Sequence, residues 1–484
     1  MRYLALFFLI GCSSLLFAQQ TPYQLFEVDS VAEPRGGQAY FNVFLQTNLR
    51  KPIQAEALGI GGRVMLTGVV ETDGSVSDIK VLTSLRPDCD REAIRVLSLF
   101  KAWKPASKGG KPVRQIVNMP IVFKANEPFT YISGNRISYF DNADKLITDS
   151  TQAAFRQVIP LDTNGLPSDD IVLYRLRGKS WKVERRLPFV REKYESGSKL
   201  KQRTYRIGYQ DAERLWQGMT FSLTSDGRLL EQTYYEHGRP KGPRITYYPN
   251  GLVAEKSDEA DTKRMITAWY TTGQIKLVRE IDSSAPLGTR NPERLSAYWD
   301  STGNQQVRDG NGLAVFRETV RSYADTTKQT SFIEQGTYQN RLKQGVWIGR
   351  YADGSYFYEE IYDKGICQKG KARTIGKDTV QYSVPEQLPE FRGGMPALGQ
   401  FLSQNLHYPP AAQRAKVQGR VFISFVINKE GEVEDVEVLK GIGFGTDEEA
   451  VRVVKASSGR WVPGAQRGQN IKVKYNLPIN FSLQ

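Results

Sequence analysis

Residues 419–439 read GRVFISFVINKEGEVEDVEVL, and residues 62–82 read GRVMLTGVVETDGSVSDIKVL. Each stretch contains two runs rich in β-branched residues, separated by a short polar segment that ends in glycine. Such a pattern predicts a β-hairpin. We therefore expect the same hairpin near both ends of the 484-residue chain.

The repetition extends well beyond the hairpin. Both copies carry an Arg-Gly-Gly tripeptide before it, and a helix start, a tryptophan and a closing proline after it. The offset is constant except for one extra residue before the second tryptophan. Matches in one order over such a length indicate an internal duplication. The paired landmarks include Arg35 and Arg392, Pro52 and Pro409, Gly74 and Gly431, Asp90 and Asp447, Trp103 and Trp461, and Pro120 and Pro478.

Each copy predicts a small α+β module with an antiparallel sheet and the order α-β-β-α-β. In the second copy, Leu398, Phe401, Leu402 and Leu406 share one helical face, and Pro409 and Pro410 end that helix. The hairpin strands follow. Thr446, three residues before Glu449, predicts a capping box for the second helix. We expect Trp103 and Trp461 to be core rings.

The last strand of the second copy is the candidate partner-binding edge. Over residues 471–481, apolar and polar residues alternate, and Pro478 is tolerable where its missing amide proton faces solvent. An unpaired edge can accept a partner's extended segment. The alternative is that this strand is fully paired, within its own sheet or with the matching strand of the first copy. The predicted partner-binding residues are Ile471, Val473, Lys474, Tyr475 and Leu477, with Lys472 and Asn476 sharing the face of Lys474.

Tyr408-Pro409, Gly419-Arg420-Val421, the Gly431 turn, Trp461-Val462-Pro463-Gly464 and Pro478-Ile479-Asn480-Phe481 together resemble the C-terminal domain of the TonB energy-transducer family. The resemblance covers residues 385–484 and, more weakly, 31–125. It implies a partner that is an outer-membrane receptor or another envelope protein, bound by strand addition. A transducer's long proline-rich spacer is not evident, because the 23 prolines are scattered. We therefore expect the module's binding behaviour rather than energy coupling.

Between the copies, aromatic pairs precede turn residues, as in YYPNG at 247–251 and WYTTG at 269–273. Asn-Gly and similar turns supply the positive φ that tight hairpins need. This pattern resembles the repeats of the YwqK-type antitoxin family, related to MORN repeats, over residues 205–370. Residues 126–204 are the least readable part of the sequence, and we interpret them as a divergent start of that array.

The first residues read as a secretory signal, with an apolar run that ends at Ala18. We expect residues 1–18 to be removed and the mature chain to begin near Gln19 in the periplasm of a Gram-negative-type envelope. The alternative is a lipid anchor on Cys12, which follows Leu9-Ile10-Gly11. Cys89 and Cys367 alone imply no disulfide framework.

The sequence carries no recognisable catalytic, cofactor or metal motif. His237 and His407 are its two histidines, and neither has a partner at ligand spacing in the sequence. The net charge of +14 is spread along the chain, which suits weak contact with anionic polymers rather than nucleic acid. We expect a non-enzymatic protein that binds envelope proteins through its end modules. The alternative is a structural or antitoxin-like scaffold whose repeats bind a protein or glycan.

Overall fold

The computed structural model describes residues 21–194, 204–260, 262–282 and 293–483. The predicted signal segment, with Cys12 and the expected start at Gln19, lies outside these residues. The chain divides into two compact units. The first comprises Met1–Asp258, Thr267–Lys276 and Ser301–Asn304, and the second comprises Glu259–Ile266, Leu277–Asp300 and Gln305–Gln484.

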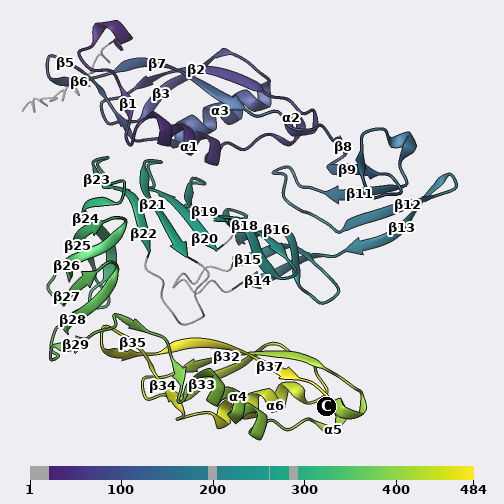
Figure 1. The fold of residues 1–484 in the computed structure, drawn as a ribbon. Coiled ribbons are helices and arrows are strands. Elements are labelled where there is room, and N and C mark those ends of the chain that lie inside the picture. The colour runs from purple at the N-terminus through teal and green to yellow at the C-terminus, as the bar shows by residue number, and fades with distance from the viewer. Residues whose placement is uncertain (1–20, 195–203, 261, 283–292, 484) are drawn as a thin grey trace, which may run out of the picture. The chain divides into compact units, whose positions relative to one another are not determined.

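The C-terminal module, residues 386–481, is an antiparallel α+β unit in the second unit of the chain. Its central sheet has the order β33-β32-β37, and helices α4 and α6 lie on one face of it (Figure 1). The α+β class agrees with the expectation from the sequence. The elements are β30 (Glu386–Gln387), β31 (Glu390–Phe391), α4 (Gly394–Asn405), α5 (Pro410–Arg414), β32 (Gly419–Ile427), β33 (Val433–Lys440), α6 (Thr446–Ala456), β34 (Trp461–Val462), β35 (Gly464–Gln466), β36 (Gln469–Ile471) and β37 (Val473–Phe481).

The core of this module follows from the alternation along β32 and the helical spacing of α4 and α6. The odd-numbered residues of β32 from Val421 to Ile427 are fully buried, whereas Arg420 is exposed on the other face. Trp461 is 1% exposed, as expected, and its indole N–H donates to Ser457 Oγ at 3.0 Å. The core side chains are Leu398, Phe401, Val421, Ile423, Phe425, Ile427, Ala450, Val453, Val454, Trp461, Leu477, Ile479 and Phe481.

The capping box predicted for α6 is wrong. The N-cap residue is Gly445, which adopts a φ of 86°, and Thr446 is already inside the helix. The Thr446 hydroxyl donates to Gly443 O at 2.6 Å instead of accepting from a helix amide. The Glu449 side chain is engaged elsewhere, because its Oε1 accepts from the His407 backbone N–H at 2.6 Å. Glycine adopts a positive φ without the steric cost of a Cβ, so Gly445 is the N-cap residue and the helix begins one residue earlier than the capping box requires.

The N-terminal module, residues 23–123, repeats this plan in the first unit of the chain. Its central sheet has the order β3-β2-β7, with α1 and α3 on one face (Figure 1). The elements are the 3-10 helix η1 (Leu25–Glu27), β1 (Glu33–Pro34), α1 (Gln38–Asn48), α2 (Ile53–Ala57), β2 (Gly62–Val70), β3 (Val76–Thr83), α3 (Pro87–Leu99), β4 (Trp103–Lys104), β5 (Ala106–Lys108), β6 (Lys111–Val113) and β7 (Gln115–Phe123).

In the described residues between the modules, the regular elements are strands and one short 3-10 helix. Residues 130–187 form a six-stranded antiparallel sheet of their own. Its elements are β8 (Thr130–Ile132), β9 (Asn135–Phe140), β10 (Leu146–Ile147), η2 (Ser150–Gln152), β11 (Phe155–Pro160), β12 (Ile171–Arg177) and β13 (Ser180–Leu187).

Strands β14 to β29 form the repeat sheet, in which the order of the strands follows the chain. The strands are β14 (Phe189–Tyr194), β15 (Thr204–Gln210), β16 (Trp216–Thr224), β17 (Leu229–Glu236), β18 (Arg239–Tyr247), β19 (Val253–Ala260), β20 (Lys263–Trp269), β21 (Ile275–Asp282), β22 (Arg294–Trp299), β23 (Gln305–Arg308), β24 (Asn311–Arg321), β25 (Gln329–Gln339), β26 (Leu342–Tyr351), β27 (Tyr356–Asp363), β28 (Ile366–Thr374) and β29 (Val380–Tyr382). None of the helices in the described ranges is long and apolar enough to cross a membrane.

The hairpin turns expected from the aromatic-turn-glycine pattern are present in the repeat sheet. Gly251 N–H donates to Tyr248 O at 2.8 Å, and Gly273 N–H donates to Tyr270 O at 2.9 Å. Gly251 and Gly273 have φ values of 82° and 86°, and Gly303 in the next turn has 93°. Glycine adopts this region without the steric cost that a Cβ would bring. The three turns therefore share a glycine with a positive φ at the same position.

These three turns pack against the N-terminal module within the first unit. The buried side chain of Asn48 at the end of α1 accepts a hydrogen bond from Val253 N–H at 2.8 Å. Lys101 N–H donates to Thr272 O at 2.7 Å. The N-terminal module therefore recognises the main chain of the turns, and the predicted hairpins are part of its packing surface.

We predict that Gly273→Ala destabilises the first unit more than Gly251→Ala does. Both substitutions put a Cβ on a left-handed backbone, which costs about 1–2 kcal/mol. At Gly273 the Cβ would also lie 2.8 Å from Phe44 Cε2, which adds about 1–3 kcal/mol of overpacking. At Gly251 its nearest neighbour would be Arg50 Nη2 at 4.0 Å. Urea unfolding of the two variants checks this, and equal losses of stability would argue against tight docking at Gly273.

Within the second unit, the C-terminal module contacts the repeat sheet through the tip of its β35–β36 hairpin. Arg467 Nε donates to Glu360 Oε1 at 2.8 Å, and the Arg467 guanidinium carbon lies 3.5 Å from the centre of the Tyr358 ring. The Glu360 side chain has no exposed surface, and its carboxylate also accepts from the hydroxyls of Tyr362 and Tyr382. The buried carboxylate is therefore fully hydrogen bonded.

We predict that Arg467→Met destabilises the second unit by about 3–5 kcal/mol, because it leaves the buried Glu360 carboxylate without its cation. The matched control is Lys371→Met, which removes an ion pair with Glu359 whose side chains are 49% and 34% exposed. An exposed pair contributes about 0–1 kcal/mol. Chemical unfolding followed by tryptophan fluorescence measures both. A loss for Arg467→Met no larger than that of the control would contradict the anchoring role of this arginine.

Candidate partner-binding site

The predicted last strand is divided in the structure. Ile471 ends β36, which pairs with β35, and β37 begins at Val473. Lys472 connects the two strands. Of the five predicted partner-binding residues, Val473, Lys474, Tyr475 and Leu477 therefore lie on β37, whereas Ile471 belongs to the preceding hairpin.

The alternation predicted from the sequence is present along β37. Leu477 is 7% exposed, Val473 and Tyr475 are half-buried, and Lys474 and Asn476 are exposed. The Tyr475 ring lies 5.2 Å from the Trp461 ring, centre to centre, and burial raises the pKa of its hydroxyl. The apolar residues of β37 therefore hold the strand on the core, so a partner added to this strand meets its main chain and its polar face.

The outer side of β37 has no paired strand among the described residues. β37 pairs with β32 in regular antiparallel register from Val473–Ile427 to Phe481–Gly419, and it ends the order β33-β32-β37. In an antiparallel ladder, alternate residues direct their N–H and C=O groups to opposite sides. Pro478 has no N–H, and within sheets proline is found where its missing donor faces solvent. The even-numbered residues, including Lys474 and Asn476, therefore direct their backbone groups outward.

The N-terminal module supplies direct evidence for this assignment. Tyr23 forms a parallel bridge with Gln115 at the outer edge of β7. Ile116 N–H donates to Tyr23 O, and Tyr23 N–H donates to Arg114 O, both at 2.9 Å. Pro120 of β7 matches Pro478 of β37, so Ile116 matches Lys474. The amide that corresponds to Lys474 is thus seen to donate outward, to an added segment of chain.

Sequence reasoning missed Tyr23. The bridge involves a single residue of an irregular segment, and no periodicity marks such a contact. The ring of Tyr23 also lies under Lys108, whose Nζ is 4.3 Å from the ring centre. An aromatic residue ahead of the first duplicated landmark, Arg35, was the only available signal, and it does not specify a partner.

One of the two lysines that share the polar face of the predicted strand is paired within the module. Lys472 Nζ donates to Glu434 Oε2 at 2.6 Å. The hydrogen bond from Lys472 lowers the pKa of Glu434 and raises the pKa of Lys472. Lys472 is therefore neutralised by its own module. No carboxylate among the described residues pairs with the exposed Lys474, which therefore stays available to a partner.

The described residues contain no group of three or more side chains arranged to hold a metal ion. His407 Nδ1 lies 2.9 Å from Arg452 Nη2 and 3.6 Å from Glu449 Oε1, a contact that its sequence neighbours do not reveal. Both Cys89 and Cys367 are free thiols, and burial raises the pKa of each to about 11. Neither cysteine is therefore activated as a nucleophile.

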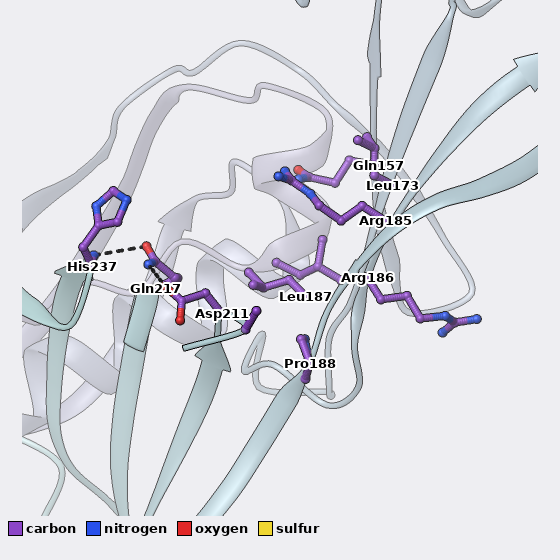
Figure 2. Close-up of a pocket in the computed structure, with 11 residues that line it drawn as sticks. Gln157, Leu173, Arg185, Arg186, Leu187, Pro188, Asp211, Gln217 and His237 are labelled. Atoms are coloured by element: carbon purple, nitrogen blue, oxygen red, sulfur yellow. Dashed lines mark hydrogen bonds between the residues drawn. The ribbon is translucent and has the colours of Figure 1, made fainter. Parts of the chain in front are cut away.

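A cavity of about 570 Å³ lies in the first unit, between the six-stranded sheet and the start of the repeat sheet. Figure 2 shows that Gln217 links two other residues of the lining: Gln217 Nε2 donates to Asp211 Oδ2 at 2.7 Å, and Gln217 Oε1 accepts from the His237 backbone N–H at 3.3 Å. Asp211 Oδ1 accepts from Leu215 N–H at 2.9 Å. These groups order a turn and a neighbouring hairpin, and they form no catalytic arrangement of acid, base and nucleophile.

Comparison with protein-family models found one match, to the family described as the Gram-negative bacterial TonB protein C-terminal, at residues 48–125 and 404–483. One match falls on each module, so the two-copy resemblance is confirmed. The matches leave the repeat sheet and the six-stranded sheet outside. No curated protein matches the chain.

Hydrogen exchange on the free protein tests the direction of the β37 amides. We expect the amides of Lys474, Asn476 and Asn480 to exchange rapidly, because they face solvent, and those of Tyr475 and Leu477 to be protected by β32. Amide-resolved exchange measured by NMR distinguishes the two sets. Uniform protection from residue 473 to residue 481 would show that the outer edge is covered, as the fully paired alternative requires.

Proposed function

We propose that this protein is an exported, non-enzymatic binding protein of the periplasm, whose C-terminal module captures an extended segment of an outer-membrane receptor or another envelope protein by strand addition at β37. This activity would serve TonB-dependent transport. The family match over residues 404–483 supports a TonB-like binding domain. The proposal of a specific mechanism rests on the geometry of the sheet edge.

The observation that carries the proposal is the bridge of Tyr23 on β7. It is strand addition within one chain, made by two main-chain hydrogen bonds at the edge that corresponds to β37. The same edge of the C-terminal module has its backbone donors directed outward and no strand to receive them among the described residues. Because the start of the β7 edge is already occupied, the C-terminal module is the receptive copy.

The bridge also indicates how a partner would run. Tyr23 pairs with Gln115 in parallel, so an added strand on β37 would run parallel to it. The outward amides of Lys474, Asn476 and Asn480 would donate to the partner, and Pro478 interrupts this series. Each such hydrogen bond contributes only about 0.5–1.5 kcal/mol net, so the affinity is expected to be modest.

Charge and side chains would set specificity. The exposed Lys474 favours a partner segment that carries an acidic residue opposite it. The net charge of +14 would add weak, salt-sensitive attraction to anionic envelope polymers. Neither a nucleic acid nor a cofactor is part of this proposal.

A second candidate function uses the repeat sheet, in keeping with its resemblance to YwqK-type and MORN repeats. Tyr323 is 51% exposed, and its ring lies 5.3 Å from the ring of Tyr351 and 5.2 Å from that of Tyr356, centre to centre. This aromatic patch could bind a protein or glycan partner in a scaffold of the antitoxin type. The same three rings pack against one another, so they also have a structural role in the sheet.

We predict that Lys474→Pro abolishes capture of the envelope partner, because it removes an outward donor without removing a bond to β32. Lys474→Ala, which keeps the amide, should weaken capture only slightly. The full chain, immobilised, is exposed to a solubilised envelope fraction, and the captured proteins are quantified for wild type, both Lys474 variants and Tyr323→Ala. Partners lost from Tyr323→Ala but retained by Lys474→Pro would instead identify the repeat sheet as the binding element.

A further inference from the structure

The two modules have a corresponding face, which is covered by repeat turns in the N-terminal module and exposed in the C-terminal module. In the N-terminal module, Arg35 and Asn48 contact the repeat turns: an Arg35 N–H donates to Thr302 O, and Asn48 accepts from Val253 N–H. Asn48 is 3% exposed and Arg35 is half-buried. This face is thus a docking surface for a row of hairpin turns.

The C-terminal module keeps the same side chains on the corresponding face. Arg392 matches Arg35, Phe401 matches Phe44 and Asn405 matches Asn48. Asn405 makes the same internal bond, with its Nδ2 donating to Phe401 O at 2.8 Å, as Asn48 does to Phe44 O at 3.0 Å. The docking chemistry is therefore retained.

This corresponding face is open. Arg392 is exposed and Asn405 is half-exposed, and no turn of the described chain donates to Asn405 Oδ1 or accepts from the Arg392 side chain. The face also differs in composition, because Ser457 stands where Phe100 does and the Arg460 guanidinium carbon lies 4.9 Å from the centre of the Phe401 ring. Its exposed cation, the Arg392 side chain, has no partner among the described residues.

The repeat sheet carries a further turn of the docked type. In residues 351–354, Gly354 N–H donates to Tyr351 O at 3.0 Å and Gly354 has a φ of 71°. Ala352, Asp353 and Gly354 are all exposed, and a Cβ on Gly354 would meet nothing within 4 Å. Asp353 stands at the turn position of Thr302, which Arg35 contacts. The aspartate thus carries the charge opposite to that of Arg392.

We propose that the C-terminal module docks the exposed turn 351–354 of a second copy of this chain, with Arg392 against Asp353. Each copy carries both halves of the contact, so a pair of copies can form it twice about a two-fold axis. The contact uses the end of α4 and the Arg392 loop rather than the main chain of β37. It is therefore separate from the strand addition proposed above.

Sedimentation velocity of the full chain over a range of concentrations tests this proposal. We expect a reversible dimer whose dissociation constant rises at least tenfold for Arg392→Glu and for Asp353→Arg, and recovers when both substitutions are in one chain. The matched control is Arg420→Glu, the same charge change at an exposed site on the opposite face of the sheet, and it should leave the dimer unchanged. Because Asp353 Oδ1 accepts from Ser355 N–H at 3.0 Å, Asp353→Asn keeps the turn intact and should still weaken the dimer.

A monomer at every concentration would overturn the proposal, and so would a dimer that responds equally to Arg392→Glu and Arg420→Glu. Failure of the proposed strand addition is distinguishable, because Lys474→Pro should leave the dimer unchanged. Conversely, loss of the dimer in Arg392→Glu should leave partner capture through β37 in place.

Discussion

The register of β37 on β32 is the constraint on which the binding account depends. Nine consecutive residue pairs, from Val473–Ile427 to Phe481–Gly419, align without a bulge. A regular antiparallel ladder assigns every backbone group of the strand to one side or the other. The odd-numbered residues therefore direct their backbone groups to β32 and their side chains to the core. The even-numbered residues direct their backbone donors and acceptors outward. A one-residue slip would bury Lys474 and expose Leu477, so the core that holds the strand also fixes which amides are available.

The two modules show how one duplicated fold can attach to its surroundings in different ways. The N-terminal copy uses the end of α1 and its neighbouring loops to hold the repeat turns, and its β7 edge receives Tyr23. The C-terminal copy instead uses a hairpin tip, where Arg467 meets a fully buried carboxylate. In the N-terminal copy the corresponding tip is Gly109-Gly110, and a Cβ on either glycine would meet nothing within 4 Å. The N-terminal copy thus leaves its hairpin tip exposed. The C-terminal copy leaves exposed the outer edge of its sheet and the face that corresponds to the turn-binding face.

Much of the local structure was predictable from the sequence because it depends on local periodicity. Strand-like patterns in the sequence predicted the hairpin at 419–439 and the alternation along residues 473–481. The burial of Trp461 was expected because it is a large aromatic ring. The helix cap at Thr446 was mispredicted because the preceding glycine, with its positive φ, is itself the N-cap residue, which places Thr446 inside the helix. The break after Ile471 and the pairing of Lys472 with Glu434 depend on contacts distant in the chain, as does the Tyr23 bridge. No local pattern encodes such contacts.

Strand addition is tested most directly by hydrogen exchange of the β37 amides with and without the captured partner. On binding, the amides of Lys474 and Asn476 should change from rapid to slow exchange, since they would donate to the added strand. The amides of Tyr475 and Leu477, already bonded to β32, should keep their rates. Protection that instead appears in the repeat sheet, with Lys474 and Asn476 still exchanging rapidly in the complex, would contradict strand addition at β37.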